Sequence, residues 1–595
     1  MTLSQRLFIA VAIFAASALS ANDRPNIIWI VVEDASAHIE PYGETAIKTP
    51  TLNQMAKDGI RFDQAFVTAP VCSPSRSAMV TGMYQMTLGA HNHRSQGRSG
   101  KSKGPEAYHA SYKVPVPLIP ELFRKAGYYV TNKTKTDYNF IPPDTLYHGK
   151  EWSKASPDQP IFAQIQLRGG KNRRAPSHAD PASLTLPPYY PDHDEIRKDW
   201  ATYLDSWVQV DVEVKRIFAA LEKANRLKNS AIFFWTDHGI SHLRGKQYLY
   251  EEGLRIPFIV QLPKKAKAGT VRTDIVEHID IAAASLALAN IPIPEHVQGR
   301  DILSPSHTPR THVFAGRDRC DETVDIMRCI RDSQYKYIRN FMSHVSHSQP
   351  NQYKDGKRIL KTIRTLNAEG KLSEIQARPF EPRRPPEELY DLKSDPHELN
   401  NLAADPTHKA RLEVMRTQLY QRMREERDMG LIPEPILEDL GRDAGNKRAA
   451  FTDTNRAEQT SRLIDVITAG EHNETQTLLA ATTHSDPSTR YWAAVWLGVN
   501  KTAAAKPQLE SLLSDEDAAV RIASAQALVK LGDPTKTSIL VDHINDPNWV
   551  AGMFALRAIE ELGEAGKPFK TQIMAARKSP YEFSRRIAKR LSAKF

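Results

Sequence analysis

Cysteine is scarce in this chain of 595 residues, which contains only Cys72, Cys320 and Cys329. So few cysteines in a chain of this length exclude a fold that depends on a framework of disulfides. Cys320 and Cys329 could form one pair, although two separate buried thiols fit the sequence equally well. The role of Cys72 has to be inferred from its neighbours.

Apolar runs long enough to cross a bilayer are also missing, because a spanning helix needs about 20 such residues. The N-terminal run, Leu7 to Leu19, is shorter and follows Arg6. The small residues Ala18 and Ser20 precede a suitable cleavage point, which is typical of a secretory signal peptide over residues 1–20, an uncleaved anchor being the alternative. The sequence therefore predicts an exported protein, periplasmic or secreted, without an integral membrane segment.

A strongly biased composition is absent as well. Hydrophobic residues make up 41% of the chain and charged residues 25%, which excludes disorder as the default. The length suggests about three domains. The net charge of +10 and the pI near 9.2 indicate acidic partners. Because Lys and Arg are spread along the chain and export is predicted, we expect an anionic polysaccharide and no nucleic acid.

Two apolar, β-branched or aromatic runs end abruptly in acids. Residues 26–32 (NIIWIVV) precede Glu33 and Asp34, and residues 231–235 (AIFFW) precede Asp237 and His238 after one threonine. Such runs predict strands that are buried on both faces, with acids at the edge where open α/β sheets bind ligands. Strand and helix patterns alternate between them, which predicts an α/β domain over residues 21–310 with a three-layer, mainly parallel sheet.

The pattern changes twice in the later chain. Strand-like residues 335–341 and the phrase ELYDLKSDPHELNNLA at 388–403 predict a small α+β subdomain over 311–430, followed by a linker over 431–456. Over 457–595, Leu-Gly pairs at 497, 531 and 562 close Ala-rich helices at intervals of 34 and 31 residues. This all-α region resembles short HEAT repeats, which bind a partner or brace a neighbouring domain.

The most specific motif is CSPSRSAMVTG at residues 72–82, with Pro74 and Arg76 two and four residues after the cysteine. It resembles the signature of type I sulfatases, members of the alkaline phosphatase superfamily, and the resemblance extends from about Pro25 to Ala403. It implies an alkaline-phosphatase-like fold, in which a maturation enzyme oxidises Cys72 to formylglycine (3-oxoalanine). One hydroxyl of the hydrated aldehyde then attacks sulfur, and the other releases sulfate.

The same resemblance implies one bound Ca²⁺. Because sulfate oxygens carry negative charge, fixed positive charge has to precede attack, and oxygen ligands favour calcium or magnesium over zinc. The candidate ligands come from the two strand ends and the modified cysteine: Glu33, Asp34, Cys72, Asp237 and His238. Glu33 replaces the commoner aspartate. Taken singly, the acids could equally be turn or helix-cap residues.

Three cations match the catalytic residues of the family. Arg76 would brace the nucleophile through its rigid fork. Lys135 in TNKTKTDYN matches the lysine of a Gly-Lys-x-His segment, with Lys133 as a competing assignment and Asp137 where the histidine would be. Lys246 in RGKQYLYEEGLRIP matches a lysine that contacts the sulfate.

The proton donor to the leaving group is less well defined. The family has a histidine soon after the strand that resembles 161–167, but no histidine follows there in this chain. Either Lys171 or His242 could replace it, and we slightly favour His242, because imidazole titrates nearer neutral pH.

Two clusters outside this shared core could select the substrate, although solvated loops fit them equally well. These residues are His91, His93, Arg94, Arg317 and Arg319. The sequence thus predicts an exported sulfatase that acts on a sulfated polysaccharide or its oligosaccharides. The alternatives are a phosphonate or phosphate-ester hydrolase of the same superfamily, and a glycan-binding scaffold with a retired active site.

Overall fold

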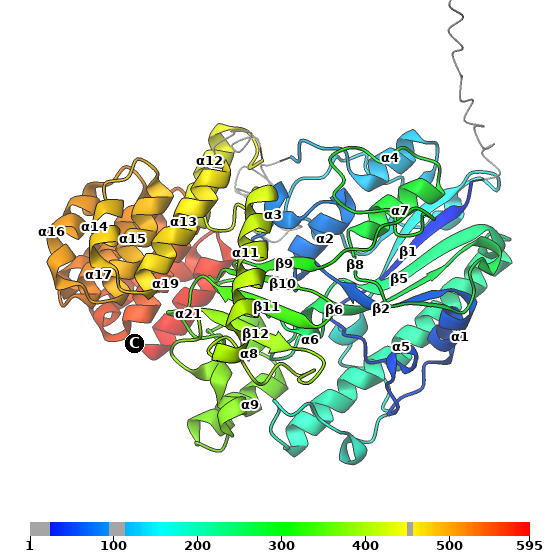
Figure 1. Ribbon diagram of the computed structural model, residues 1–595, viewed down its shortest axis with the longest axis horizontal. Helices are drawn as coiled ribbons and strands as arrows, with labels where there is room; N and C mark the ends of the chain where they lie inside the picture. The colour runs from blue at the N-terminus through cyan, green and yellow to red at the C-terminus, as the bar shows by residue number, and fades with distance from the viewer. Residues whose placement is uncertain (1–23, 95–112, 449–455) are drawn as a thin grey trace, which may run out of the picture.

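The computed structural model describes residues 24–94, 113–448 and 456–595 (Figure 1). The predicted signal peptide, residues 1–20, lies outside these segments. Within them, none of the helices combines the length and the apolar character that crossing a bilayer requires. Cys72, Cys320 and Cys329 are all buried free thiols, so the possible pairing of Cys320 with Cys329 is not formed.

The large sheet is mainly parallel, as predicted. Its strands lie in the order β3-β4-β1-β5-β6-β2-β7, with β8 beside β2. β1 runs parallel to β4 and β5, whereas β6 runs antiparallel to both β5 and β2. The bounds are β1 Asn26–Val32, β2 Ile60–Phe66, β3 Tyr129–Lys133, β4 Ile161–Leu167, β5 Ser230–Thr236, β6 Arg255–Gln261, β7 Thr270–Arg272 and β8 Val276–Glu277.

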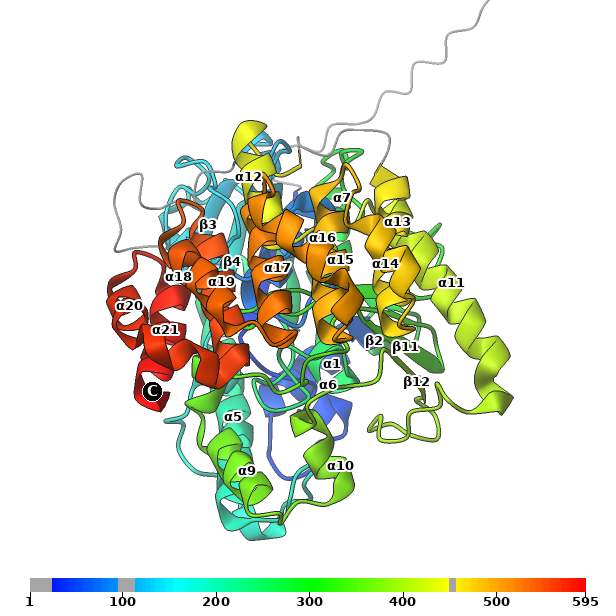
Figure 2. The same ribbon diagram turned by 90° about the vertical axis from the view of Figure 1, so that its left-hand side faces the viewer.

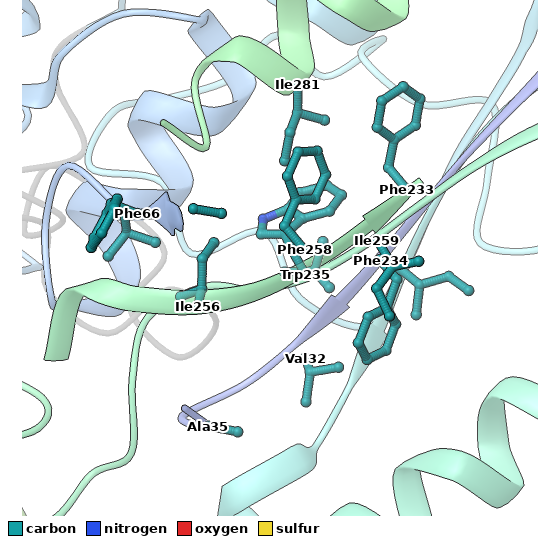
Figure 3. Packing of buried hydrophobic residues seen from close by; sticks show 14 of the residues in the cluster. Val32, Ala35, Phe66, Phe233, Phe234, Trp235, Ile256, Phe258, Ile259 and Ile281 are labelled. Atoms are coloured by element: carbon teal, nitrogen blue, oxygen red, sulfur yellow. The ribbon is translucent and has the colours of Figure 1, made fainter. Parts of the chain in front are cut away.

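Helices cover both faces of this sheet, which gives the three predicted layers (Figure 1). α1 (Pro50–Asp58) and α5 (Asp194–Lys223) lie on one face, and α2 (Cys72–Thr81), α4 (Ile119–Lys125) and α7 (Asp280–Leu288) lie on the other. Side chains of a strand alternate between the faces. Accordingly, Trp235 points toward Ile281 of α7 while Phe234 points to the opposite side (Figure 3). Every residue of β1 and β5 is buried.

A smaller antiparallel sheet follows in the order β12-β11-β10-β9. Its strands are β9 Val313–Arg317, β10 Met327–Arg331, β11 Tyr335–Asn340 and β12 Glu387–Asp391. α11 (Lys409–Glu425) packs on β10 and β11. This is the expected small α+β subdomain.

The C-terminal region is a stack of helix pairs that begins with α13 (Arg456–Glu471) (Figure 2). Its longer helices pack in series: α15 Pro487–Val499, α17 Ala518–Lys530, α19 Trp549–Leu562 and α21 Glu582–Lys594. Asp486, Asp517 and Asn548 cap the first three by accepting a backbone N–H two residues on. The repeat is therefore visible in the capping residues as well as in the Leu-Gly pairs.

The segment predicted as a linker over 431–456 is folded and packed in its described part, residues 431–448. Leu431, Ile432, Ile436 and Leu437 are buried in one apolar cluster together with the small sheet and the repeats. α12 (Glu434–Asp443) packs on α17 and α19, and the indole of Trp492 donates to the carbonyl of Leu431 at 2.8 Å. Its apolar residues are covered by helices that are distant in the sequence.

Candidate active site

The two strand ends deliver their acids side by side. β1 and β5 are parallel neighbours in which Val32 lies opposite Thr236, so residues 33–34 and 237–238 leave the sheet at the same edge. The Asp237 N–H donates to Val32 O at 2.9 Å, and the Asp34 N–H donates to the Asp237 carboxylate at 3.0 Å. Asp34 has the left-handed φ of 51°, a conformation held by its surroundings and common at functional sites.

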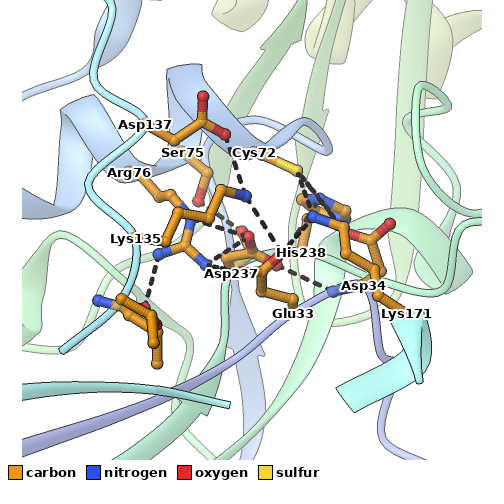
Figure 4. A network of polar contacts seen from close by, with 12 residues as sticks. Glu33, Asp34, Cys72, Ser75, Arg76, Lys135, Asp137, Lys171, Asp237 and His238 are labelled. Atoms are coloured by element: carbon orange, nitrogen blue, oxygen red, sulfur yellow. Dashed lines mark hydrogen bonds and ion pairs between the residues drawn. The ribbon is translucent and has the colours of Figure 1, made fainter. Parts of the chain in front are cut away.

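Cys72 is the first residue of α2, on the face of the sheet opposite α5, and its side chain lies next to these acids (Figure 4). It is fully buried. Its Sγ lies 2.9 Å from Lys246 Nζ, 3.1 Å from His238 Nε2, and 3.6 Å from both Lys171 Nζ and Asp34 Oδ1. Burial raises the pKa of the thiol, but the neighbouring lysines outweigh burial and hold that pKa well below its usual value. The site therefore stabilises negative charge at position 72.

Four donors could hold a divalent cation. Ligand atoms of Asp34, Cys72, Asp237 and His238 all lie within 4.8 Å of one another, and all four residues are buried. His238 Nδ1 is 2.8 Å from the Gly239 carbonyl, so its N–H donates there and Nε2 is the nitrogen that faces the acids. A metal-binding imidazole needs that orientation, and the carboxylates suit a hard cation such as calcium. Glu33, also predicted as a ligand, lies outside this group.

Glu33 instead pairs with cations. Lys135 Nζ lies 3.1 Å from its carboxylate, Lys171 Nζ also contacts it, and Arg76 Nη2 lies at 3.7 Å. Burial raises the pKa of Glu33, but these charges outweigh it and lower the pKa. Lys133, the competing assignment, lies apart at the surface and pairs with Glu151 at 3.4 Å. The geometry thus brings Lys135 to the site.

Arg76 is fully buried and forms a fork against Asp237. Its Nε and Nη2 lie 3.0 and 2.9 Å from the same carboxylate oxygen, and Nη1 donates to Gln166 at 2.6 Å. Around Cys72, four cations therefore face four carboxylates. The cations are Arg76, Lys135, Lys171 and Lys246, and the acids are Glu33, Asp34, Asp137 and Asp237. A divalent cation held by these acids would make the site positive and favour an anionic ligand.

The two candidate proton donors occupy different places. Lys171 reaches Cys72, as described above. His242 is buried against Asp199 at 2.8 Å and Arg173 at 2.7 Å, and in the described segments no hydrogen bond or ion pair joins it to Cys72. Burial, aided by Arg173, lowers the pKa of His242 to about 4 despite Asp199. Of the two candidates, Lys171 is therefore the one that contacts Cys72.

The five predicted substrate residues also separate. A ring nitrogen of His93 lies within 4.8 Å of both Cys72 Sγ and an Asp137 carboxylate oxygen. Arg94 lies beside them, with Nε 3.1 Å from Asp137. Asp137, which stands where the family has a histidine, thus pairs with Lys135 and Arg94 rather than with a substrate.

The other three residues predicted to bind substrate lie inside the protein. Arg317 forms an ion pair with Asp325, and Arg319 forms one with Glu434, and both arginines are only 2–3% exposed. His91 is equally buried, and burial together with Arg328 holds its pKa well below the usual value. Arg317 ends β9 and Arg319 follows it, and their ion pairs hold both guanidinium groups in the interior.

Sequence reasoning missed Tyr353. It lies in the short helix α8 (Gln352–Asp355), and its hydroxyl donates to Asp34 at 2.8 Å while Lys246 Nζ lies 4.7 Å from the ring centroid. The contact joins residues 319 positions apart in the chain. Residues 343–357 show neither a motif nor a periodic pattern, so no local signal could have identified it.

Comparison with known proteins identifies the family of this chain. A family model described as Sulfatase matches residues 25–166 and 144–291, one described as N-sulphoglucosamine sulphohydrolase, C-terminal, matches 238–359, and one for HEAT repeats matches 475–560. An ulvan-active sulfatase of Formosa agariphila is 33% identical over 469 residues, which cover 71% of this chain and 78% of that relative. A second ulvan-active sulfatase of that organism is 25% identical over 462 residues, 72% of this chain and 85% of its own.

Solved structures agree at the level of the fold. The phosphonate monoester hydrolase of Agrobacterium radiobacter superposes with a TM-score of 0.50 and 16% identity over 69% of this chain and 97% of its own. A Bacteroides thetaiotaomicron structure from work on glycosaminoglycan metabolism gives 0.51 and 17%, over 70% of this chain and 99% of its own.

Fold and family together define a hydrolase of the alkaline phosphatase superfamily. Within that superfamily, the chain belongs to the type I sulfatases and carries HEAT repeats at its C-terminus. It is a sulfuric ester hydrolase.

Proposed function

We propose that this sulfatase is exported and removes sulfate esters from a sulfated polysaccharide or its oligosaccharides, with formylglycine at position 72 and one calcium ion. The observation that carries the proposal is the buried cluster around Cys72, in which lysines and an imidazole surround the sulfur atom. The ulvan-active relatives support a glycan substrate.

The proposed groups fit the residues around them. A hydrated formylglycine at position 72 would supply a hydroxyl nucleophile, and a calcium ion held by Asp34, Asp237 and His238 would supply positive charge for the sulfate oxygens. Arg76 fixes the Asp237 carboxylate through two N–H groups. The remaining sequence-predicted ligand, Glu33, orients Lys135 and Lys171 rather than binding the ion.

The lysines bind the sulfate and move the proton in this proposal. Lys246, 3% exposed and 2.9 Å from Sγ, is placed to neutralise charge on the sulfuryl oxygens. Lys171 lies 3.6 Å from Sγ on the loop after β4, where the family places its leaving-group acid. We assign Lys171 as the group that gives a proton to the departing alcohol oxygen.

A basic cavity between β3 and α5 supports a polymeric substrate. Its volume is about 670 Å³, and it lies between the end of β3, the second half of α5 and residues 150–157. Its charged and aromatic lining consists of Lys133, Lys150, Glu151, Trp152, Arg216, Lys223 and Arg226. Lys133 is two residues from Lys135, so we propose that the cavity binds sulfated or carboxylated sugar units next to the cleaved ester.

The experiment compares ester types and polymers. Purified protein, coexpressed with a formylglycine-generating enzyme, is incubated with ulvan fragments, sulfated glycosaminoglycan fragments and matched aryl sulfate and aryl phosphate esters. We expect sulfate release, and peptide mass spectrometry should find an aldehyde at position 72. A strong preference for the phosphate ester, or an unmodified thiol in active protein, would contradict the proposal.

A further inference from the structure

Two consecutive acids, Asp321 and Glu322, lie between the C-terminal helix and the active site. They are 3% and 0% exposed, and Asp321 has the left-handed φ of 53°. Buried carboxylates are costly unless they are paired and hydrogen-bonded. The residues that pair with Asp321 and Glu322 therefore show which segments the Asp321-Glu322 turn connects.

Asp321 connects the turn to His93. The His93 Nδ1 lies 3.2 Å from the Asp321 carboxylate, and the His93 N–H donates to the Arg319 carbonyl at 2.9 Å. Neither ring nitrogen of His93 makes a hydrogen bond within the described residues, so its contact with Asp321 is an ion pair, and the ring is 2% exposed and adjoins Cys72. His93 thus places an imidazole without a hydrogen-bond partner beside the nucleophile, in the region where Asp137 replaces the histidine of the family.

Glu322 connects the same turn to Tyr353. Its carboxylate accepts the Gln352 N–H at 2.6 Å, at the start of α8. The next residue of α8 is Tyr353, whose hydroxyl donates to Asp34 at 2.8 Å. Any displacement of Glu322 would therefore move the hydroxyl that holds a candidate metal ligand.

Two arginines on one face of α21, the last helix of the repeats, form ion pairs with these acids. Arg586 Nη1 lies 3.1 Å from Glu322 and 3.5 Å from Asp321, and Arg590 Nη1 lies 2.6 Å from Glu322. The two arginines are four residues apart and so lie on the same side of the helix. Glu582 and Glu560 fix them in turn.

We propose that α21 is a positioning element of the active site. Its arginines keep the Asp321-Glu322 turn in place, and the turn sets His93 beside the nucleophile and Tyr353 on Asp34. The last helix of the HEAT repeats thus supports the active site, and the repeats are not a separable binding module. The inference rests on the proposed role of the Cys72 cluster and adds to it the function of the repeats.

The test uses the full chain and a matched set of variants on α21. Arg590→Gln and Arg586→Gln should each lower kcat/KM for sulfate release by about tenfold, since misplacement of catalytic groups by 1 Å can cost up to about 10²-fold. Lys589→Gln removes an exposed charge from the same helix and should leave kcat/KM unchanged. All variants are compared at equal folded fraction, measured by circular dichroism.

Double-mutant cycles separate positioning from stability. Arg590→Gln combined with Tyr353→Phe should cost little more than the larger single effect, because both act on the same contact. Calcium affinity, measured by titration calorimetry, should weaken in Arg590→Gln and Tyr353→Phe and stay unchanged in Lys589→Gln. Additive kinetic losses with unchanged calcium affinity would overturn the inference, as would Arg590→Gln behaving like Lys589→Gln.

The two proposals fail in different ways. If Cys72→Ala keeps full activity, the proposed active site is wrong whatever the α21 variants do. If Cys72→Ala is inactive while the arginine variants match Lys589→Gln, only the positioning role is overturned.

Discussion

The catalytic edge of the large sheet and the helical repeats are built in opposite ways. Around Cys72, buried cations and carboxylates crowd together, and Asp34, Arg94 and Asp137 adopt left-handed backbone conformations. Burying charge and holding such conformations costs stability, even when the charges are paired. In the repeats, alanine and leucine side chains such as Ala525 and Leu528 fill a continuous apolar core. The comparison indicates that the site depends on stability supplied elsewhere in the chain.

The two regions are nevertheless connected through the small sheet. Its buried residues share one apolar cluster with the repeats and with α12. Arg339 of β11 pairs with Glu471 of α13 at 2.6 Å, and Arg557 of α19 donates to Gln349 at 3.0 Å. We therefore expect substitutions at the site to change activity more than stability, and substitutions in the repeats to do the reverse except along α21.

The largest effect should follow removal of the nucleophile. Cys72→Ala should lower sulfate release by more than about 10³-fold, because loss of a nucleophile leaves only binding and electrostatic stabilisation. The melting temperature of Cys72→Ala should stay close to that of the native chain, because the substitution removes only one sulfur atom and no large apolar side chain. The control is Cys329→Ala, another buried thiol, whose pKa burial raises to about 12. Activity measured as released sulfate that survives in Cys72→Ala would contradict the assignment.

The second prediction compares the two candidate proton donors. Lys171→Ala should lower kcat by about 10²- to 10³-fold, the range typical of a lost general acid. His242→Ala should lower kcat by less than about tenfold, because the imidazole is paired with Asp199 and does not contact Cys72. Aryl sulfates with better leaving groups should rescue Lys171→Ala, since they need less protonation. Equal losses in the two variants, or no rescue, would sink the assignment of Lys171.

Removal of calcium should also lower the rate of sulfate release. Prolonged dialysis against a chelator should lower sulfate release by about 10²-fold, and added Ca²⁺ should restore it better than Zn²⁺. A ligand at 100 times its Kd stabilises the folded state by about 2.7 kcal/mol, so the melting temperature should rise with calcium concentration. Asp237→Asn should abolish this rise. Metal-free protein with full activity would exclude a catalytic ion.

The sequence predicted the parts of the site that are written in short motifs or at strand ends. CSPSR identified Cys72 and Arg76, and the apolar runs before residues 33 and 237 identified the edge at which Asp34 and His238 meet. Parallel pairing of buried strands makes that convergence predictable. Glu33 was placed correctly at the edge, but its partners could not be anticipated from the sequence.

The features that could not be predicted from the sequence share one physical cause. Tyr353, the buried ion pairs of Arg317 and Arg319, and the packing of residues 431–448 all depend on segments that are far apart in the chain. A charged or apolar residue in a loop carries no local sign of what will cover it. The sequence left open whether the repeats bind a partner or brace a neighbouring domain, and the structure shows a core that they share with the small sheet.

A core substitution in the repeats tests that shared core. Leu528→Ala should destabilise the chain by about 3 kcal/mol, the typical cost of a cavity left by a fully buried leucine. Because the repeats and the small sheet share one cluster, unfolding followed by calorimetry should remain a single transition at lower temperature. Lys506→Ala, at an exposed position of the same region, should change little. A split transition, with activity lost only in the second step, would show that the repeats fold independently of the site.

The smallest effect concerns the basic cavity beside β3. Lys150→Ala combined with Lys223→Ala should raise KM for a sulfated polymer about three- to tenfold at low salt, while kcat and the KM for an aryl sulfate stay unchanged. The two lysines line the cavity but do not contact the Cys72 cluster, so only substrates long enough to reach both places should detect their loss. Salt should shrink the difference, because exposed charges are screened within about 10 Å at 0.1 M. Lys228→Ala combined with Lys215→Ala removes the same charge from exposed positions that do not line the cavity. If this control pair raises KM for the polymer equally, the effect is one of overall charge, and the cavity has no separate role in binding the chain.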